Sequence, residues 1–153
     1  MSIVFDHVNI VVDDLEATQA FFVDTFGFVS GTPTTLEGAW VDELNGYSNA
    51  RATYVPLTPP AGGGTTRIEI LTFESPASPP ASGKLGAPNH IGYRHICLDV
   101  ADIQAMYEQL KPDWQFLSEP VAVPPPFNVT TVYFIGPEGV LIQLTQKSEM
   151  ADR

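Results

Sequence analysis

Hydrophobic and polar residues alternate from the start of the chain in the pattern of a half-buried β-strand. Residues 5 to 12 read Phe-Asp-His-Val-Asn-Ile-Val-Val. Because successive side chains of a strand point to opposite faces, Val8 and Ile10 share one face, while His7 and Asn9 point to the other. The pattern predicts a strand with a buried apolar face and a polar face that begins at His7.

The residues that follow have the pattern of a capped helix. Asp14 stands where an N-cap belongs, and Glu16 places a second carboxylate in the first turn, where the helix dipole favours negative charge. Gly27 follows at the position of a C-terminal cap. The helical period predicts an inward face made of Leu15, Thr18, Phe21, Phe22 and Phe26.

Shorter elements complete the first half of the chain. A short strand is predicted near residues 27 to 31, and residues 32 to 50 have the composition of a loop with one helical turn. Residues 51 to 57 and 65 to 73 alternate as strands on either side of a connection rich in Pro and Gly. They therefore predict a hairpin.

The same order of elements returns after residues 77 to 90, whose Pro, Ser, Gly and Ala content is that of a linker. A strand is predicted over residues 93 to 100 and a helix from 103 to about 111. Residues 128 to 135 and 140 to 145 predict a closing hairpin.

An internal repeat relates the two halves. When the chain is aligned on itself with His7 on His95, the shared order is a strand, an Asp-capped helix and a later hairpin. The alignment superimposes Val12 on Val100 and Asp14 on Asp102, and the pattern of the last strands superimposes Glu69 on Gln143. The halves therefore predict two related modules.

The repeat places a metal-competent side chain at the same two positions of each half: His7 and Glu69 in the first, His95 and Gln143 in the second. Glu69 lies between two isoleucines, where a carboxylate is costly to bury unless it is hydrogen-bonded, bound to metal, or paired with a neighbour such as Arg67. Two imidazoles, a carboxylate and an amide oxygen suit a divalent ion of Zn, Ni, Co, Mn or Fe.

Composition and charge narrow the function classes. The chain has 153 residues, 44% hydrophobic and 16% charged, which is the balance of a globular protein. A net charge of −11 without Lys/Arg clusters argues against nucleic acid and anionic membranes as partners. No apolar run approaches the roughly 20 residues of a membrane span. With one cysteine and no visible secretory signal, we expect a cytoplasmic protein.

Three segments resemble the vicinal oxygen chelate superfamily, which includes glyoxalase I, methylmalonyl-CoA epimerase, bleomycin resistance proteins and extradiol dioxygenases. Residues 7 to 15, followed by the aromatic run at 21 to 28, resemble its opening. Residues 95 to 100 resemble the opening of its second module, and residues 136 to 144 its closing hairpin. The resemblance spans nearly the whole chain.

The resemblance implies an α+β fold in which two βαβββ modules form a curled mixed sheet around a central cleft. Residues 1 to 153 would be one domain, with module one at about 1–76, the linker at 77–90 and module two at about 91–147. It implies metal ligands at His7, Glu69, His95 and Gln143. The family commonly has a glutamate where this chain has Gln143, which leaves Glu69 as the only carboxylate of the set.

We therefore expect a metal-dependent lyase or isomerase of the glyoxalase type, which would stabilise the enolate or enediolate of a small oxygen-chelating substrate. Glu69 is the candidate catalytic base. A ferrous ring-cleaving dioxygenase and a non-catalytic small-molecule binding or resistance protein remain alternatives. Loops 32–50, 59–64 and 118–127 would shape the pocket, and exposed edge strands favour a homodimer.

Overall fold

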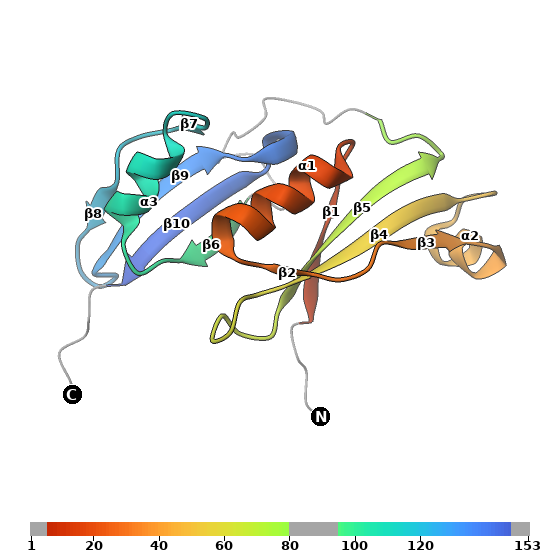
Figure 1. The fold of residues 1–153 in the computed structure, drawn as a ribbon, viewed down its shortest axis with the longest axis horizontal. Coiled ribbons are helices and arrows are strands. Elements are labelled where there is room, and N and C mark those ends of the chain that lie inside the picture. The colour runs from red at the N-terminus through yellow and green to blue at the C-terminus, as the bar shows by residue number, and fades with distance from the viewer. Residues whose placement is uncertain (1–5, 80–94, 148–153) are drawn as a thin grey trace. The chain divides into compact units, whose positions relative to one another are not determined.

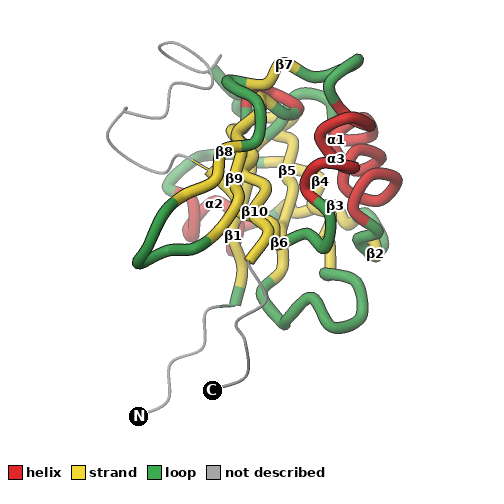
Figure 2. Tube along the Cα trace, turned by 90° about the vertical axis from the view of Figure 1, so that its left-hand side faces the viewer, coloured by secondary structure: helices red, strands yellow, loops and turns green. Residues whose placement is uncertain are grey.

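The computed structural model describes residues 6–79 and 95–147 and divides the chain into two compact units, Met1–Pro80 and Ala81–Arg153 (Figure 1). Each unit contains a five-stranded mixed sheet, whose strands are yellow in Figure 2. The predicted α+β class and its two modules are confirmed. Most of the predicted linker, residues 80 to 90, lies outside the described residues.

The first unit has the strand order β1-β5-β4-β2, with β3 also paired to β4. β1 runs parallel to β5, whereas β4 and β5 form the predicted antiparallel hairpin. The elements are β1 (His7–Val11), α1 (Leu15–Ala20), η1 (Phe21–Thr25), β2 (Val29–Ser30), β3 (Thr34–Glu37), α2 (Ala39–Asn45), β4 (Arg51–Thr58) and β5 (Arg67–Ser75).

The second unit repeats this topology, with the order β6-β10-β9-β7 and β8 paired to β9. β6 runs parallel to β10, and β9 and β10 form the closing hairpin. The elements are β6 (His95–Asp99), α3 (Ile103–Leu110), β7 (Gln115–Phe116), β8 (Val121–Val123), β9 (Val129–Ile135), η2 (Pro137–Gly139) and β10 (Leu141–Lys147).

Each unit has its own apolar core on one face of its sheet. In the first unit Thr18, Phe21 and Phe22 are buried as the helical period predicts. The strands contribute the buried side chains Ile10, Val55, Leu57, Ile68 and Ile70. In the second unit the corresponding strand residues are Ile96, Val132, Phe134, Ile142 and Leu144. Fully burying such a side chain contributes about 1.5–3 kcal/mol.

Three local expectations are corrected by the structure. The predicted helix over residues 15–26 is α-helical only to Ala20 and continues as a π-helical turn, η1, before Gly27 adopts a φ of 71°. The segments 32–50 and 118–127, expected to be mainly loops, contain β3 and β8, and the helical turn predicted within residues 32–50 is confirmed as α2. Both strands are short. β3 pairs with the longer strand β4 and β8 pairs with the longer strand β9, so these pairings stabilise them and their own residues show no periodic pattern.

Candidate functional site

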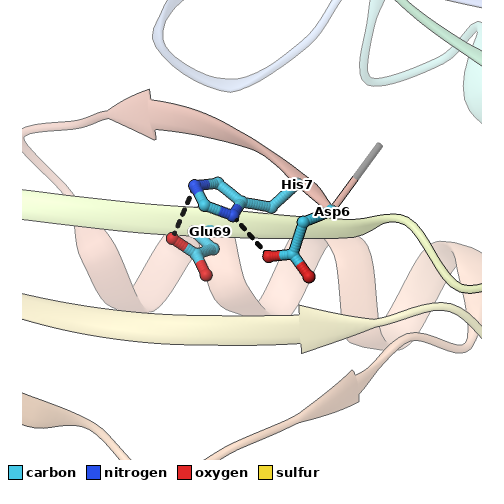
Figure 3. Close-up of side chains that lie close together, drawn as sticks. All are labelled: Asp6, His7 and Glu69. Atoms are coloured by element: carbon cyan, nitrogen blue, oxygen red, sulfur yellow. Dashed lines mark hydrogen bonds and ion pairs between the residues drawn. The ribbon is translucent and has the colours of Figure 1, made fainter. Parts of the chain in front are cut away.

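His7 and Glu69 meet on the open face of the first sheet. Both face away from the buried isoleucines, and Figure 3 shows their side chains in front of the strands with a helix behind the sheet. His7 Nε2 lies 3.3 Å from Glu69 Oε2. The Glu69 side chain is 12% exposed and that of His7 is 40% exposed. The sequence-predicted pair is therefore brought together within module one.

Asp6 holds the other edge of the His7 ring. Asp6 Oδ2 lies 2.8 Å from His7 Nδ1 and 2.6 Å from Arg67 Nη2. The hydrogen bond to His7, and then that to Arg67, lower the pKa of Asp6. Arg67 has a raised pKa because it donates to Asp6. Asp6 therefore favours a hydrogen on Nδ1 and directs Nε2 toward Glu69.

His7 Nε2 and Glu69 Oε2 face each other directly. A neutral imidazole has one N–H, and Asp6 engages it at Nδ1, so an unprotonated Nε2 would face the carboxylate with its own lone pair. Either a second proton or a metal ion removes this repulsion. Two ligands of a tetrahedral divalent ion, each about 2.1 Å from it, stand about 3.4 Å apart. The 3.3 Å separation of Nε2 and Oε2 fits that geometry.

Asp6, His7 and Glu69 together have one ligand atom each within 4.8 Å of the others. Asp6 nevertheless contacts Nδ1, whereas Glu69 contacts Nε2. These two nitrogens lie on different edges of the imidazole, so one ion bound at Nε2 does not meet Asp6. We therefore assign Asp6 to orienting His7 rather than to binding the ion.

The second oxygen of Glu69 is held by two neighbours. Tyr54 donates its hydroxyl to Glu69 Oε1 at 3.0 Å, and Arg67 Nη2 lies 3.5 Å from the same oxygen. Burial raises the pKa of Tyr54, and the hydrogen bond to Glu69 raises it further, so Tyr54 stays a donor. The pairing of Glu69 with Arg67 weighed from the sequence is thus present. Oε2 remains directed at His7.

Module two places His95 and Gln143 at the equivalent register positions of its parallel strand pair. In module one Asn9 pairs with Glu69 across the parallel strands, and in module two Cys97 pairs with Gln143. Each histidine stands two residues before that pair, on the same face. His95 contacts the Tyr133 ring edge-to-face at 5.4 Å. The two histidines and the residues Glu69 and Gln143 therefore occupy the same positions in the strand register of their modules, as the repeat predicted. A joint site made by all four residues stays a prediction.

Sequence reasoning did not identify Asp6, Tyr54 and Thr131 as partners of the candidate ligands. Asp6 had a usable signal, since it precedes His7 directly. Tyr54 and Thr131 had none, because their contacts with Glu69 and Gln143 depend on the register of neighbouring strands. Thr131 accepts from Gln143 Nε2 at 2.8 Å.

Two related modules, each a five-stranded mixed sheet with a polar face carrying a histidine and an amide or carboxylate, are typical of glyoxalase-like proteins. The sequence model of the Glyoxalase/Bleomycin resistance protein/Dioxygenase superfamily matches residues 4–144. The chain belongs to this superfamily.

Solved structures of similar proteins agree with the fold. A glyoxalase family protein from Bacillus cereus is 27% identical, with a TM-score of 0.78 and coverage of 92% of this chain and 91% of that one. Glyoxalase I of Leishmania major is 20% identical, with a TM-score of 0.59 and coverage of 95% and 88%. An antibiotic-binding protein from Streptomyces is 19% identical, with a TM-score of 0.60 and coverage of 97% and 99%.

A search of curated proteins finds no match. Within residues 6–79 and 95–147, no helix has the length and apolar character needed to span a membrane.

Proposed function

We propose that the protein is a metal-dependent lyase or isomerase of the glyoxalase type that acts on a small substrate with adjacent oxygens. The observation that carries this proposal is the His7 Nε2–Glu69 Oε2 separation of 3.3 Å, which fits two ligands of one divalent ion. His95 and Gln143, at the equivalent register positions of module two, would complete the ligand set.

A divalent ion held by these residues would supply Lewis acidity toward a substrate carbonyl. Glu69 would act as the base for the proton beside that carbonyl after its Oε2 has swung off the ion, because Tyr54 and Arg67 contact the other oxygen, Oε1. Tyr54 and Arg67 hold Oε1, so the carboxylate is oriented before substrate arrives.

Metal content tests the proposal. We expect the purified protein to bind about one divalent ion per chain, and the variant carrying both His7→Ala and His95→Ala to lose it. Asn9→Ala is the matched control, because it removes a polar side chain from the same face of β1 without removing a proposed ligand. Unchanged metal content in the double variant would contradict the site. Iron together with oxygen uptake would instead favour the dioxygenase alternative.

A non-catalytic small-molecule binding protein is the second candidate, and one observation favours it. Glu69 already has Arg67, Tyr54 and His7 as partners, and these can compensate its charge without a metal. One of the structurally similar proteins is described as antibiotic-binding. Protein purified without chelator that contains no metal and does not bind added nickel would favour this candidate.

A further inference from the structure

A network of hydrogen bonds joins four side chains of module two, Cys97, Thr145, Thr131 and Gln143. Cys97 Sγ lies 3.5 Å from Thr145 Oγ1, and Thr145 Oγ1 lies 3.1 Å from Thr131 Oγ1. Thr131 Oγ1 also lies 2.9 Å from the Leu144 carbonyl oxygen and 2.8 Å from Gln143 Nε2. Thr145 is 9% exposed, so its hydroxyl depends on protein partners.

The direction of these hydrogen bonds follows from their terminal acceptor. A backbone carbonyl can only accept, so the single hydroxyl proton of Thr131 goes to Leu144. Thr131 Oγ1 must then accept from its other two neighbours. Thr145 therefore donates to Thr131, and the Cys97 thiol donates to Thr145. In this network each of the two threonine hydroxyls donates one hydrogen bond.

The same reasoning orients the amide of Gln143. The oxygen and nitrogen of an amide are assigned from the hydrogen-bond network. Because Thr131 Oγ1 presents lone pairs, the amide group facing it must be the NH₂ donor, as the 2.8 Å contact has it. The carbonyl oxygen is on the other arm of the planar amide and is turned away from Thr131.

Module one has a hydroxyl at the equivalent position with the opposite role. Tyr54 pairs with Leu71 across β4 and β5, two residues beyond Glu69, as Thr131 pairs with Thr145 two residues beyond Gln143. Tyr54 donates to Glu69, and Arg67 adds positive charge. A donating hydroxyl suits a carboxylate, whereas an accepting hydroxyl suits an amide and repels a carboxylate.

We propose that the hydroxyl on the neighbouring strand selects the side chain at each of these positions, so that Thr131 specifies glutamine at 143 and turns its carbonyl oxygen to the open face. Thr131 is thus a positioning residue. The selection of glutamine by Thr131 stands apart from the proposed function. Only the use of the Gln143 carbonyl oxygen as a metal ligand rests on it. The selection also gives a physical reason why this chain carries Glu69 in module one and Gln143 in module two.

The first test uses the metal-free full chain. Thr131→Val should lower the melting temperature by roughly 3–8 °C, because it leaves the Gln143 NH₂ and the buried Thr145 hydroxyl without the oxygen to which they donate. It should also move the Gln143 side-chain amide signal in a ¹⁵N–¹H spectrum toward that of solvated glutamines. Thr131→Ser keeps the hydroxyl and should restore both. Thr130→Val, one position away on the opposite face of β9, is the control and should leave the amide signal in place.

A double-mutant cycle then tests the selection itself. Gln143→Glu should lower the melting temperature in the parent by more than it does in the Thr131→Val chain, with a difference of roughly 2–4 °C. The added negative charge is common to both backgrounds and cancels in the cycle. Equal losses in the two backgrounds, or a Gln143 amide signal that Thr131→Val does not move, would overturn the proposal.

Nickel titration separates this proposal from the proposed function. If Gln143 is a ligand, Thr131→Val should weaken nickel binding several-fold and Thr131→Ser should restore it. A parent chain that binds no nickel, together with an intact coupling between Thr131 and Gln143, would contradict the metal site and leave the selection standing. Absence of coupling with normal nickel binding would contradict the selection alone.

Discussion

At the scale of single residues, the candidate site is governed by which atoms donate and which accept. Asp6 engages Nδ1 of His7 and thereby presents Nε2 to Glu69. Glu69 is 12% exposed and has donors on Oε1. Gln143 faces an acceptor instead. Glu69 and Gln143 therefore stand at the same position of their modules but differ in chemistry, one a carboxylate and the other an amide.

The contact between Asp6 and His7 should make the free energy of unfolding fall in acid. The pKa of Asp6 lies below the ordinary value of about 3.9, chiefly because His7 donates to it, so its stabilisation is fully present above that pH and is lost as pH falls through the lower folded value. Denaturation midpoints of parent and Asp6→Asn, measured with chelator from pH 7 to 3, should differ above pH 4 and converge below it. The difference should be small, because Asp6 is exposed and screened. A difference that persists undiminished to pH 3 would contradict this assignment.

At the scale of elements, the repeat is expressed in the helix caps. Asp14 accepts from the backbone N–H of Ala17 at 2.9 Å, and Asp102 accepts from that of Ala105 at 2.9 Å. Each aspartate begins the helix that follows the first strand of its module. An aspartate is therefore the N-cap of the first helix in both halves.

Removal of either cap should cost similar stability. Asp14→Ala and Asp102→Ala should each destabilise the protein by about 1 kcal/mol, because each leaves a helix N–H without its partner. Thermal melting should show a decrease of about 2–4 °C for each variant. The asparagine variants retain an acceptor and should lose much less. An alanine variant that melts at the parental temperature would show that its cap contributes nothing.

At the scale of the whole molecule, the chain consists of two units that each bury an apolar face. The other face of the first sheet carries His7, Asn9 and Val11, and Val11 is 46% exposed. A module of this size has a small core, since a chain below about 80 residues rarely gains more than 3–5 kcal/mol from its core alone. The expected homodimer remains a prediction.

Residues 1–76 expressed alone should therefore be insoluble or unfolded, because the fragment combines a small core with a partly apolar open face. Circular dichroism during heating, with the oligomeric state checked by sedimentation, measures this. The full chain under the same conditions is the control. A cooperative transition from a monomeric fragment would show that module one is an independent domain.

Much of the fold follows from local patterns. The alternation around His7 and His95 predicted β1 and β6 with their exposed polar faces, because the two-residue period is a property of any extended chain. The caps at Asp14 and Asp102 are local as well. β3 and β8 escaped prediction, since each is a short edge segment whose hydrogen bonds go to a strand elsewhere in the sequence.

The sequence by itself determined the order of the longer strands and helices, the faces of those strands and the candidate ligands, because these depend on residue type and short-range period. Only the tertiary structure decided which neighbours those ligands have. Tyr54 reaches Glu69 and Thr131 reaches Gln143 through the register of antiparallel strands, and a shift of one residue would turn either hydroxyl to the opposite face. Which group donates then follows from the acceptors. The Glu69 carboxylate can only accept from Tyr54, and the Leu144 carbonyl can only accept from Thr131.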